Sequence, residues 1–290
     1  DCPLIDLDAP PCTVTEVPEG LAIHRLKLCT PVLEYDLIVS IPVMKTHMHT
    51  GATLSVKNMK GCLWRRSKVD LHMLPPVAGE AERPLNIAIA DLATVLRPDL
   101  ALIDGTVGLE GLGPSAGTPK RTNTVVASAD AFAADAVACT LMGVDLVDVP
   151  HVRLGAARGL GVVDTGRMRI TPSHWRTWAT AFAGPPVSLD VAFPGTEILD
   201  NQSCSACQST LFLFLQRYGE RLSDYFPEGT KLQLAIGRGH DELPPGCLCI
   251  GNCTARHREG RLFAPGCPPV ASNIMRLIEE SGGNDADADG

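Results

Sequence analysis

The chain has 290 residues, of which 45% are hydrophobic, and it carries a formal net charge of −8 at pH 7. This length and composition suffice for one large domain or two smaller domains with proper cores. The acidic balance argues against a nucleic-acid-binding protein, because neutralising phosphates needs an excess of basic residues. No apolar run reaches the roughly eighteen residues of a membrane span, so we expect none.

The N-terminal sequence and the cysteines indicate the compartment. Residues 1–11, DCPLIDLDAPP, are acidic and interrupted by prolines, so they do not resemble a signal peptide. The chain also begins without a methionine, and we expect a fragment or a processed form. A secreted disulfide scaffold would be shorter and denser in cysteine than this chain with its eleven. These observations predict a cytoplasmic protein whose clustered thiols bind a metal.

Apolar runs and glycines predict the elements of the first 171 residues. Buried strands are expected at 36–44, 98–105 and 122–128. A helix is expected at 130–143, and a second one at 151–161 ends in glycines. Because strands alternate with helices, we predict an α/β fold with a mixed or mostly parallel sheet flanked by helices. Its functional loops should follow the carboxyl ends of the strands.

The helix predicted at 130–143 carries signals at both ends. Ser128 or Asp130 is placed to cap its N-terminus, and Gly143 follows its C-terminus. Asp135 lies among alanines in this helix, and we expect it to be half buried against a partner such as a lysine.

The composition changes at about residue 172. Residues 172–203 contain prolines, two of the three tryptophans and no clear periodicity. They are predicted to be a connecting stretch on the surface of an α/β domain formed by residues 1–171. A smaller C-terminal α/β domain that binds iron–sulfur is expected at 204–282, and an acidic disordered tail at 283–290.

Six cysteines cluster in the last third of the chain. Cys204 and Cys207 form a close pair separated by two residues, and Cys267 precedes a proline, as in ferredoxin sequences. Pro268 suits the first turn of a helix, and the positive end of a helix favours a negatively charged thiolate cluster. We therefore predict one [4Fe–4S] cluster, with the ligands Cys204, Cys207, Cys253 and Cys267.

Two alternatives to this ligand set stay open. Cys247 or Cys249 could replace Cys253, although alternation along a strand would place those two on one face, where they could pack or pair. A four-cysteine zinc site is the second alternative. Structural zinc sites usually show two close cysteine pairs, whereas this sequence shows one, so we favour iron–sulfur.

A second concentration of functional side chains lies in PVMKTHMHTGATLSVKNMKGC, residues 42–62. Its three lysines and two histidines are an unusual concentration of possible positive charge in an acidic protein. They indicate a pocket for a carboxylate or phosphate, in which His47 and Lys57 act on the bound molecule. A solvated basic edge without a ligand is the alternative. The expected binding residues are Lys45, His49, Asn58 and Lys60.

Residues 103–119, IDGTVGLEGLGPSAGTP, follow a predicted strand and contain five glycines. A loop of this kind lets backbone N–H groups approach a ligand, and we assign this role to Gly111 and Gly113. The segment has neither Walker nor dinucleotide-binding spacing. Asp104 and Glu110 are predicted to orient the basic residues or to move protons.

Together these segments resemble the domain of unknown function 362 (DUF362) family of uncharacterised iron–sulfur-cluster-binding proteins. The cysteine motifs CSAC, GNC and GCPP are similar to a subset of that family with a cluster domain. The resemblance implies cluster binding and an α/β pocket, with no established reaction, and we expect the chain to lack the family's usual N-terminal α/β portion. The matching stretches are KTH at 45–47, TLSVKNMKGC at 53–62, LIDGTVGLEGLGPSAG at 102–117, VVASADAFAADAVACTLMG at 125–143 and GLGVVD at 159–164.

The sequence as a whole predicts an iron–sulfur oxidoreductase, in which the cluster passes electrons to an anionic substrate or cofactor in a Lys/His/Asp pocket. A redox protein such as a ferredoxin is the expected partner. Two alternatives are a non-enzymatic electron carrier or docking protein with a structural cluster, and a carboxylate-processing enzyme without redox chemistry.

Overall fold

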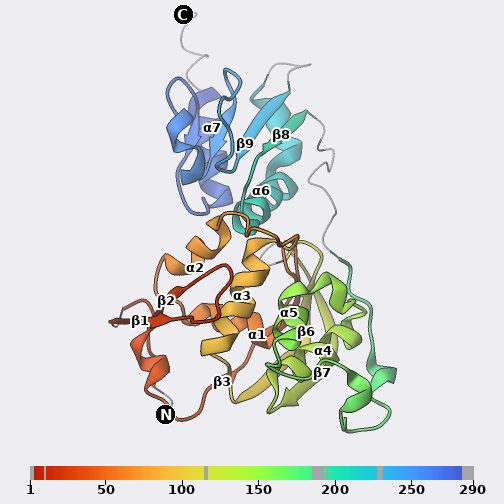
Figure 1. Ribbon diagram of the computed structural model, residues 1–290. Helices are drawn as coiled ribbons and strands as arrows, with labels where there is room; N and C mark the ends of the chain where they lie inside the picture. The colour runs from red at the N-terminus through yellow and green to blue at the C-terminus, as the bar shows by residue number, and fades with distance from the viewer. Residues whose placement is uncertain are drawn as a thin grey trace, which may run out of the picture. The chain divides into compact units, whose positions relative to one another are not determined.

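The structure is a computed structural model, and Figure 1 shows its course from the N-terminus to the C-terminus. The chain divides into two compact units. The first unit comprises Asp1–Gly111 and Gly117–Pro185, and the second comprises Leu112–Ala116 and Pro186–Gly290. The residues that the structure describes are 3–9, 11–113, 117–184, 193, 195–226 and 231–282.

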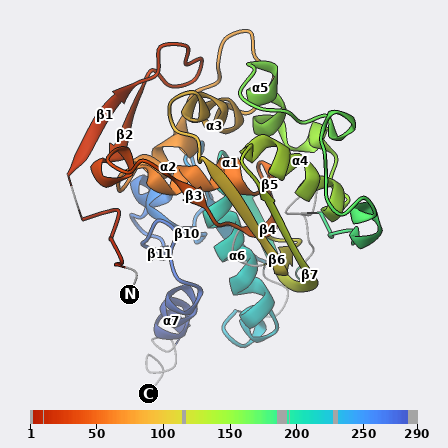
Figure 2. The same cartoon turned by 90° about the horizontal axis from the view of Figure 1, so that it is seen from below.

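A five-stranded mixed sheet forms the centre of the first unit. Strand β6 (Leu100–Glu110) runs parallel to β3 (Val39–Ser40) and β4 (Val43–His47), which pair with one of its edges. Strand β7 (Thr118–Ser128) pairs with β6 antiparallel, and Figure 2 shows the two as one long hairpin. The short strand β5 (Gly51–Thr53) pairs antiparallel with β4.

Helices flank this sheet. Helix α4 (Ala131–Met142) packs against β6 and β7, and α5 (Pro150–Ala157) packs against α4 and α3 (Pro84–Val95). The four-residue helix α1 (Ser55–Asn58) contacts α4 and β6. The predicted α/β class with a mixed sheet flanked by helices is therefore confirmed. Among the described residues, the unit's other α-helix is α2 (Ser67–Asp70), and its other strands are the antiparallel pair β1 (Cys12–Glu16) and β2 (Arg25–Cys29).

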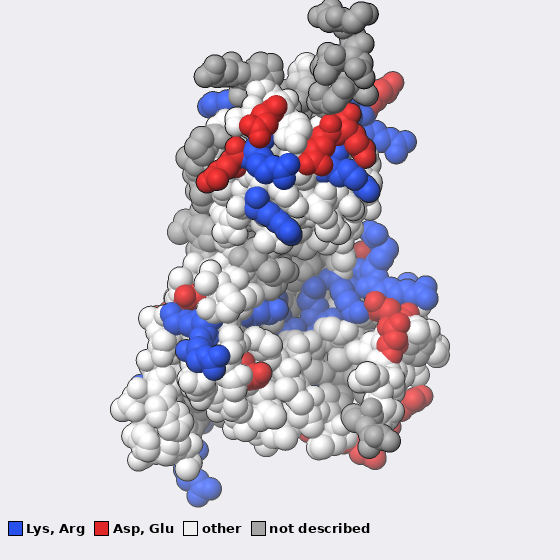
Figure 3. Space-filling model, turned by 180° about the vertical axis from the view of Figure 1, so that it is seen from behind, with Lys and Arg blue, Asp and Glu red and all other residues white. Residues whose placement is uncertain are grey.

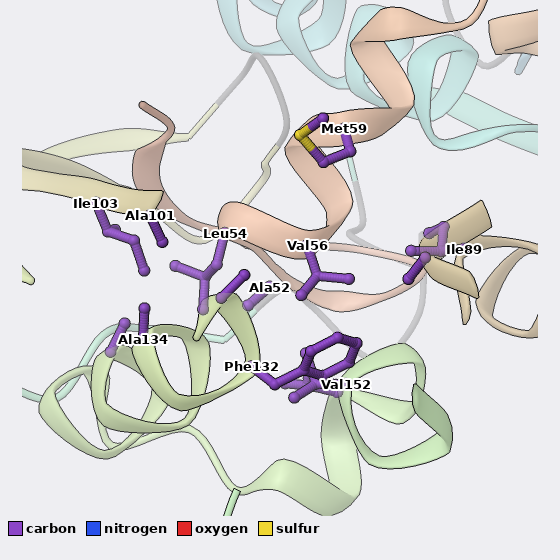
Figure 4. Packing of buried hydrophobic residues seen from close by; sticks show 14 of the residues in the cluster. Ala52, Leu54, Val56, Met59, Ile89, Ala101, Ile103, Phe132, Ala134 and Val152 are labelled. Atoms are coloured by element: carbon purple, nitrogen blue, oxygen red, sulfur yellow. The ribbon is translucent and has the colours of Figure 1, made fainter. Parts of the chain in front are cut away.

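The main hydrophobic core lies between the sheet and these helices. Leu54 lies between Ile103 of β6 and helix α4, and Val56 points toward Phe132 of α4 and Val152 of α5 (Figure 4). Each of these five side chains is at most 3% exposed. Because burying apolar surface contributes about 25 cal/mol per Å², this packing holds α1 firmly against α4.

Asp91 of α3 is a fully buried charge with several partners. Its carboxylate accepts hydrogen bonds from the backbone N–H groups of Leu21, Ala22 and Ile23 at 2.7–3.1 Å. Arg158 Nη1 lies 2.6 Å from the same carboxylate. Hydrogen bonds to an ionised group are strong, so these contacts stabilise a charge that would otherwise be costly to bury.

Residues 103–119, predicted to be a glycine-rich loop, are mostly strand, because β6 and β7 extend into the segment from both sides. The glycines within β6 serve packing. A Cβ at Gly108 would lie 2.7 Å from the Phe182 ring, and one at Gly105 would lie 2.9 Å from the Met44 methyl group. Glycine in a strand often marks such a close approach, and here it was mistaken for loop composition.

The second unit contains a four-stranded sheet in the order β11-β10-β9-β8, in which every pair is parallel. Its strands are short, as is typical of a small domain. Parallel sheets need cover on their faces, because βαβ connections place helices there. The strands are β8 (Thr196–Asp200), β9 (Leu232–Ile236), β10 (Leu248–Ile250) and β11 (Phe263–Ala264).

Helices α6 (Ser205–Tyr218) and α7 (Ala271–Gly282) share one core with this sheet. Leu211 and Phe214 of α6 and Ile274 of α7 are 0% exposed in that core. The predicted smaller C-terminal α/β region therefore has its own hydrophobic core.

The predicted connecting stretch 172–203 is divided between the two units. Trp175 and Phe182 are buried in the core of the first unit, and the Phe182 N–H donates to the carbonyl of Met142 at 2.8 Å. The end of the stretch forms β8, an edge strand of the second sheet. Residues 283–290, predicted to be a tail, lie outside the described residues.

Candidate functional site

The pocket predicted in residues 42–62 is built on a hairpin and a short helix. Strands β4 and β5 pair so that Lys45 lies opposite Thr53. Four residues later, Lys57 of α1 donates a hydrogen bond from Nζ to Thr53 Oγ1 at 2.7 Å. The register of the hairpin therefore places two lysines near one threonine.

A carboxylate from α4 fixes the orientation of α1. Asp135 accepts hydrogen bonds from the N–H groups of Ser55 at 2.7 Å and Val56 at 3.0 Å. Burial raises the pKa of Asp135 to about 7, and the two amides act in the opposite direction. The expectation of a half-buried aspartate with a lysine partner was wrong, because the side chain is 0% exposed and binds the first amides of α1.

Basic side chains gather on the first unit (Figure 3). Three lysines line a pocket of about 200 Å³ there. Lys60 Nζ lies 3.0 Å from His72 Nε2, and Lys68 Nζ forms an ion pair with Asp8 at 2.6 Å. Of the residues predicted for an anion pocket, Lys57, Asn58 and Lys60 line this space, whereas Lys45, His47 and His49 are not among its lining residues. The residues that line it are Thr53, Lys57, Asn58, Lys60, Gly61 and Lys68.

Lys57 is the most unusual member of this pocket. Lys57 is only 7% exposed, and its Nζ donates a hydrogen bond to the Thr53 hydroxyl rather than to a carboxylate. Burial, and then the charges of Lys60 and Lys45, hold the pKa of Lys57 well below its usual value of 10.5. Desolvation and like charges both favour the neutral amine.

Buried histidines surround this lysine. His47 Nδ1 accepts the backbone N–H of His49 at 3.1 Å, which assigns the ring proton of a neutral imidazole to Nε2. Burial and then the charge of Lys57 hold the pKa of His47 well below 6.5. His151 is 0% exposed, and within the described residues neither of its ring nitrogens has a hydrogen-bond partner. Burial and Lys57 lower the pKa of His151 to about 3, and burial and Lys60 lower that of His72 to about 3.

The four cysteines predicted as cluster ligands all follow the carboxyl ends of parallel strands in the second unit. Cys204 and Cys207 follow β8 at the start of α6, Cys253 follows β10, and Cys267 follows β11. Ligands of open parallel sheets bind at this edge, where the connecting loops meet.

Hydrogen bonds hold two of these loops together. The Asn252 N–H donates to the carbonyl of Gly266 at 2.8 Å, and the Gly266 N–H donates to Asn252 Oδ1 at 2.9 Å. These residues immediately precede Cys253 and Cys267. Gly251 has a φ of +89°, and a Cβ there would lie 3.3 Å from Cys207 Sγ. The backbone of the loop after β10 therefore passes close to the thiol of Cys207 at Gly251.

Electrostatic coupling links all four thiols. The Cys207 thiol and then the backbone N–H groups at the start of α6 lower the pKa of Cys204 to about 6. The pKa of Cys207 is raised by Cys204, then by burial, and then by Cys253 and Cys267. Among the described residues, no three His, Cys, Asp or Glu side chains are arranged to hold a metal ion, and none of the described cysteines forms a disulfide.

Cys247 and Cys249 lie elsewhere on the second sheet. Both are 0% exposed and share a small core with Ala235 and Leu243. Neighbouring Leu248 points into the larger core instead, as alternation along a strand requires. The thiols of Cys247 and Cys249 therefore belong to a small hydrophobic core on one face of the sheet, whereas Cys253 lies in the loop after β10.

Comparison with known proteins places the first part of the chain in a family. Residues 1–140 match the sequence model of the family described as Domain of unknown function (DUF362). The match covers 140 of the 290 residues, and we refer to them as the DUF362 domain after the model that they match. The resemblance inferred from the sequence motifs is thereby confirmed for this region, and the expected likeness of residues 200–280 to cluster-bearing members stays a prediction.

The chain also has a curated relative. The thylakoid-associated protein sll1697 of Synechocystis sp. (strain ATCC 27184 / PCC 6803 / Kazusa) is 29% identical over 137 residues. The alignment spans 47% of this chain and 42% of the relative, so the chain spans less than half of that protein. No solved structure matches the chain. None of the described helices is long and apolar enough to cross a membrane.

Several predicted site residues of the DUF362 domain have structural partners away from the pocket. Asp104 accepts hydrogen bonds from the N–H and the hydroxyl of Thr106 at 2.8 and 2.7 Å. Glu110 accepts from Lys120 Nζ and from the Ala183 N–H, both at 2.8 Å. Neither acid lines the pocket. Their predicted catalytic roles therefore receive no support from the geometry.

The two glycines assigned to ligand binding also lie apart from the pocket lining. Gly111 has a φ of +77°, and its N–H donates to the carbonyl of Ala183 at 2.8 Å. Its own carbonyl accepts the Thr46 hydroxyl at 3.2 Å. Gly113 follows two residues later, at the end of the described part of this turn. Gly111 therefore shapes the end of the β6–β7 hairpin.

Sequence reasoning missed several residues near the pocket. Thr53, His72 and His151 carried no local signal, and Lys68 lay beyond the segment chosen. His151 lies outside the DUF362 match, and tertiary packing brings it close enough for the charge of Lys57 to lower its pKa.

Proposed function

We propose that this protein is an iron–sulfur redox protein whose second unit binds one [4Fe–4S] cluster through Cys204, Cys207, Cys253 and Cys267. The pocket of the DUF362 domain then binds the anionic small molecule that exchanges electrons with the cluster. The observation that carries the proposal is the position of all four cysteines on loops at one edge of a parallel sheet.

The chemistry of these residues fits the cluster. Thiolates are its usual ligands, and the Cys207 thiol and the N–H groups at the start of α6 lower the pKa of Cys204, whereas Cys204 and burial raise the pKa of Cys207. Helix α6 begins directly after Cys204, so its N–H groups face a region of negative charge. Gly251 keeps the β10 loop close enough to Cys207 that a side chain there would crowd the thiol. When bound, the cluster would supply one-electron transfer.

The pocket supports an anionic partner for this chemistry. Lys57, Lys60 and Lys68 line a space of about 200 Å³, and Asn58 adds an amide. A small molecule with a carboxylate or phosphate matches both the charge and the size of this space. We include a redox partner protein such as a ferredoxin, and a cytoplasmic location, in the same proposal.

Anaerobic reconstitution tests the cluster. The full chain, incubated with ferrous iron and sulfide under reducing conditions, should turn brown and hold about four iron atoms per chain. Reduction with dithionite should then give an electron paramagnetic resonance signal. The double variant Cys204→Ser/Cys207→Ser should lose colour, iron and signal.

A matched double variant controls for general thiol loss. Cys12→Ser/Cys62→Ser removes two half-buried cysteines of the first unit and should keep the full iron content. Cys249→Ala tests the alternative ligand and should also keep it. A colourless chain that binds zinc after anaerobic preparation, or iron retained by the Cys204/Cys207 variant, would overturn the proposal.

A further inference from the structure

Three cysteines of the first unit, Cys12, Cys29 and Cys62, have no part in the proposed cluster. The register of the β1–β2 ladder places Cys12 directly opposite Cys29. An isolated bridge between Leu28 and Leu63 brings Cys62 toward the other side of Cys29. All three thiols are free of disulfides. The first unit therefore gathers thiols to which neither the cluster nor the anion pocket gives a role.

The hydrogen bonds of the ladder show which kind of pair Cys12 and Cys29 form. The Thr30 N–H donates to the carbonyl of Pro11 at 3.1 Å, one step along the ladder from the two cysteines. Hydrogen-bonded and non-hydrogen-bonded pairs alternate in an antiparallel ladder, so Cys12 and Cys29 form a non-hydrogen-bonded pair. The Cα atoms of such a pair lie about 4.5 Å apart, and both side chains point to the same face.

This spacing suits a disulfide, because the Cα atoms of bridged cysteines lie roughly 4.4–6.8 Å apart. Cys12 is a better partner for Cys29 than Cys62 is. Five successive residue pairs set the register of β1 and β2, whereas Cys62 approaches only beside an isolated bridge. Burial and then the Cys29 thiol raise the pKa of Cys62 to about 11, which leaves little of its thiolate near neutral pH.

The two paired thiols differ in exposure. Cys12 is half-buried, so a dissolved reagent can reach it, whereas Cys29 is 0% exposed. The Cys29 thiol donates a hydrogen bond to the carbonyl of Leu7 at 3.1 Å, and burial is the largest cause of its raised pKa. A reagent should therefore meet Cys12 first, and Cys29 should react with the product.

We propose that Cys12 and Cys29 form a reversible disulfide by exchange with a small soluble disulfide such as oxidised glutathione. This modification site goes beyond the proposed function and depends neither on the cluster nor on the anion pocket. A bond that glutathione forms and breaks makes the β1–β2 hairpin responsive to the redox state around the protein. Because the bond consumes the Cys29 S–H, it also removes the hydrogen bond to Leu7.

The exchange balances with oxidised glutathione as the only oxidant. The Cys12 thiolate attacks one sulfur of this disulfide, which forms a mixed disulfide at Cys12 and releases one glutathione thiolate. Cys29 then loses its proton and attacks Cys12 Sγ, which breaks the mixed disulfide and releases the second glutathione. Two protein thiols are oxidised, and one disulfide is reduced to two thiols. Since burial raises the pKa of Cys29, the second step should quicken as the pH rises.

Peptide mapping tests this assignment on the full chain. The protein is incubated anaerobically with an excess of oxidised over reduced glutathione, and the remaining thiols are blocked with iodoacetamide. Cleavage after lysine and arginine and before aspartate places Cys2, Cys12, Cys29 and Cys62 on different peptides. Mass spectrometry without reductant should find the Cys12 and Cys29 peptides linked in most chains, and dithiothreitol should separate them.

Three variants provide matched comparisons. Cys12→Ser changes a half-buried strand residue and should abolish the link without a change at the buried Cys29. Cys29→Ala should also abolish the link and should keep glutathione on Cys12 as a mixed disulfide, because the second thiol is gone. Cys62→Ser should leave the link between Cys12 and Cys29 at the wild-type level. Circular dichroism checks that each variant remains folded.

The chain unfolded in urea is the control for chance pairing. There the yield of the Cys12–Cys29 link should fall to that of other cysteine pairs at similar separation, because the ladder no longer holds the two thiols together. An equal yield in the folded and the unfolded chain overturns the proposal. A link from Cys29 to Cys62 in the folded chain, or a Cys12–Cys29 link in only a minority of chains, also overturns it. None of these outcomes alters the iron content or the anion binding on which the proposed function is tested.

Discussion

Asp91 and Lys57 are both buried charged residues of the first unit, yet their surroundings differ sharply. Asp91 receives three backbone N–H groups and the guanidinium of Arg158. Lys57 has a hydroxyl for its partner and two lysines for neighbours. A buried charge whose neighbours complete its bonding stabilises a fold, whereas one whose neighbours oppose it indicates a site that a ligand completes.

Removing Asp91 is the strongest test of this difference. Asp91→Ala leaves three backbone N–H groups and Arg158 without their acceptor in a buried region. We expect the free energy of unfolding to fall by about 3–5 kcal/mol, measured by urea denaturation. A loss below about 1 kcal/mol would mean that the network contributes little and that the two buried charges are alike.

His151 sharpens the comparison through its dependence on pH. Its pKa lies at about 3 in the folded chain and near 6.5 when unfolded, so only the unfolded state takes up a proton between these values. Its contribution to stability is therefore complete above pH 6.5 and is lost as the pH falls toward 3. Between pH 7.5 and pH 4, protonation of His151 in the unfolded state should lower the free energy of unfolding by about 3 kcal/mol.

The matched measurement uses His151→Phe. Over the same pH range, the free energy of unfolding of this variant should fall by about 3 kcal/mol less than that of the wild type, because phenylalanine does not titrate. His72 has a similar pKa and titrates in the same window, so it remains as an internal reference in both proteins. Equal pH dependence in wild type and variant would show that His151 does not stay neutral in the fold.

Lys57→Met should have a smaller effect on stability, and in the opposite direction from Asp91→Ala. An apolar side chain of similar length avoids burying an amine among cations, so the free energy of unfolding should stay equal or rise by about 1 kcal/mol. Urea denaturation at neutral pH measures the change. A loss of more than about 2 kcal/mol would assign Lys57 a structural role like that of Asp91.

The smallest effect is expected at Asp104. Asp104 is half-buried, and among the described residues its carboxylate bonds only to Thr106 of its own strand. Asp104→Asn should therefore leave anion binding to the pocket within about twofold, as measured by calorimetry, because substitutions away from a site rarely perturb it. A larger change would restore the catalytic role predicted from its position after a strand.

Local chemistry made part of the fold predictable. Asp130 caps α4 by accepting from the N–H groups of Phe132 and Ala133, and Gly143 ends it with a φ of +66°. Both positions follow from neighbouring residues alone. The α/β class followed in the same way from the order of apolar runs.

Contacts between distant residues could not be predicted. Asp135 binds amides 80 and 79 positions away, and the charge of Lys57 lowers the pKa of His151, which lies 94 positions further along the chain. The sequence did not predict the full length of β6, because glycines are typical of loops. In the structure, Gly105 and Gly108 lie in the strand and leave space for the side chains of Met44 and Phe182. Such pairings depend on tertiary structure, which a single sequence does not reveal.

The link between Asp135 and α1 bears on how the chain is made. The ribosome synthesises Lys57 long before Asp135, the acid that orients helix α1 and lies 80 positions beyond Ser55. During synthesis the lysine must therefore remain solvated and protonated, and its chemical character changes only once α4 has emerged and docked.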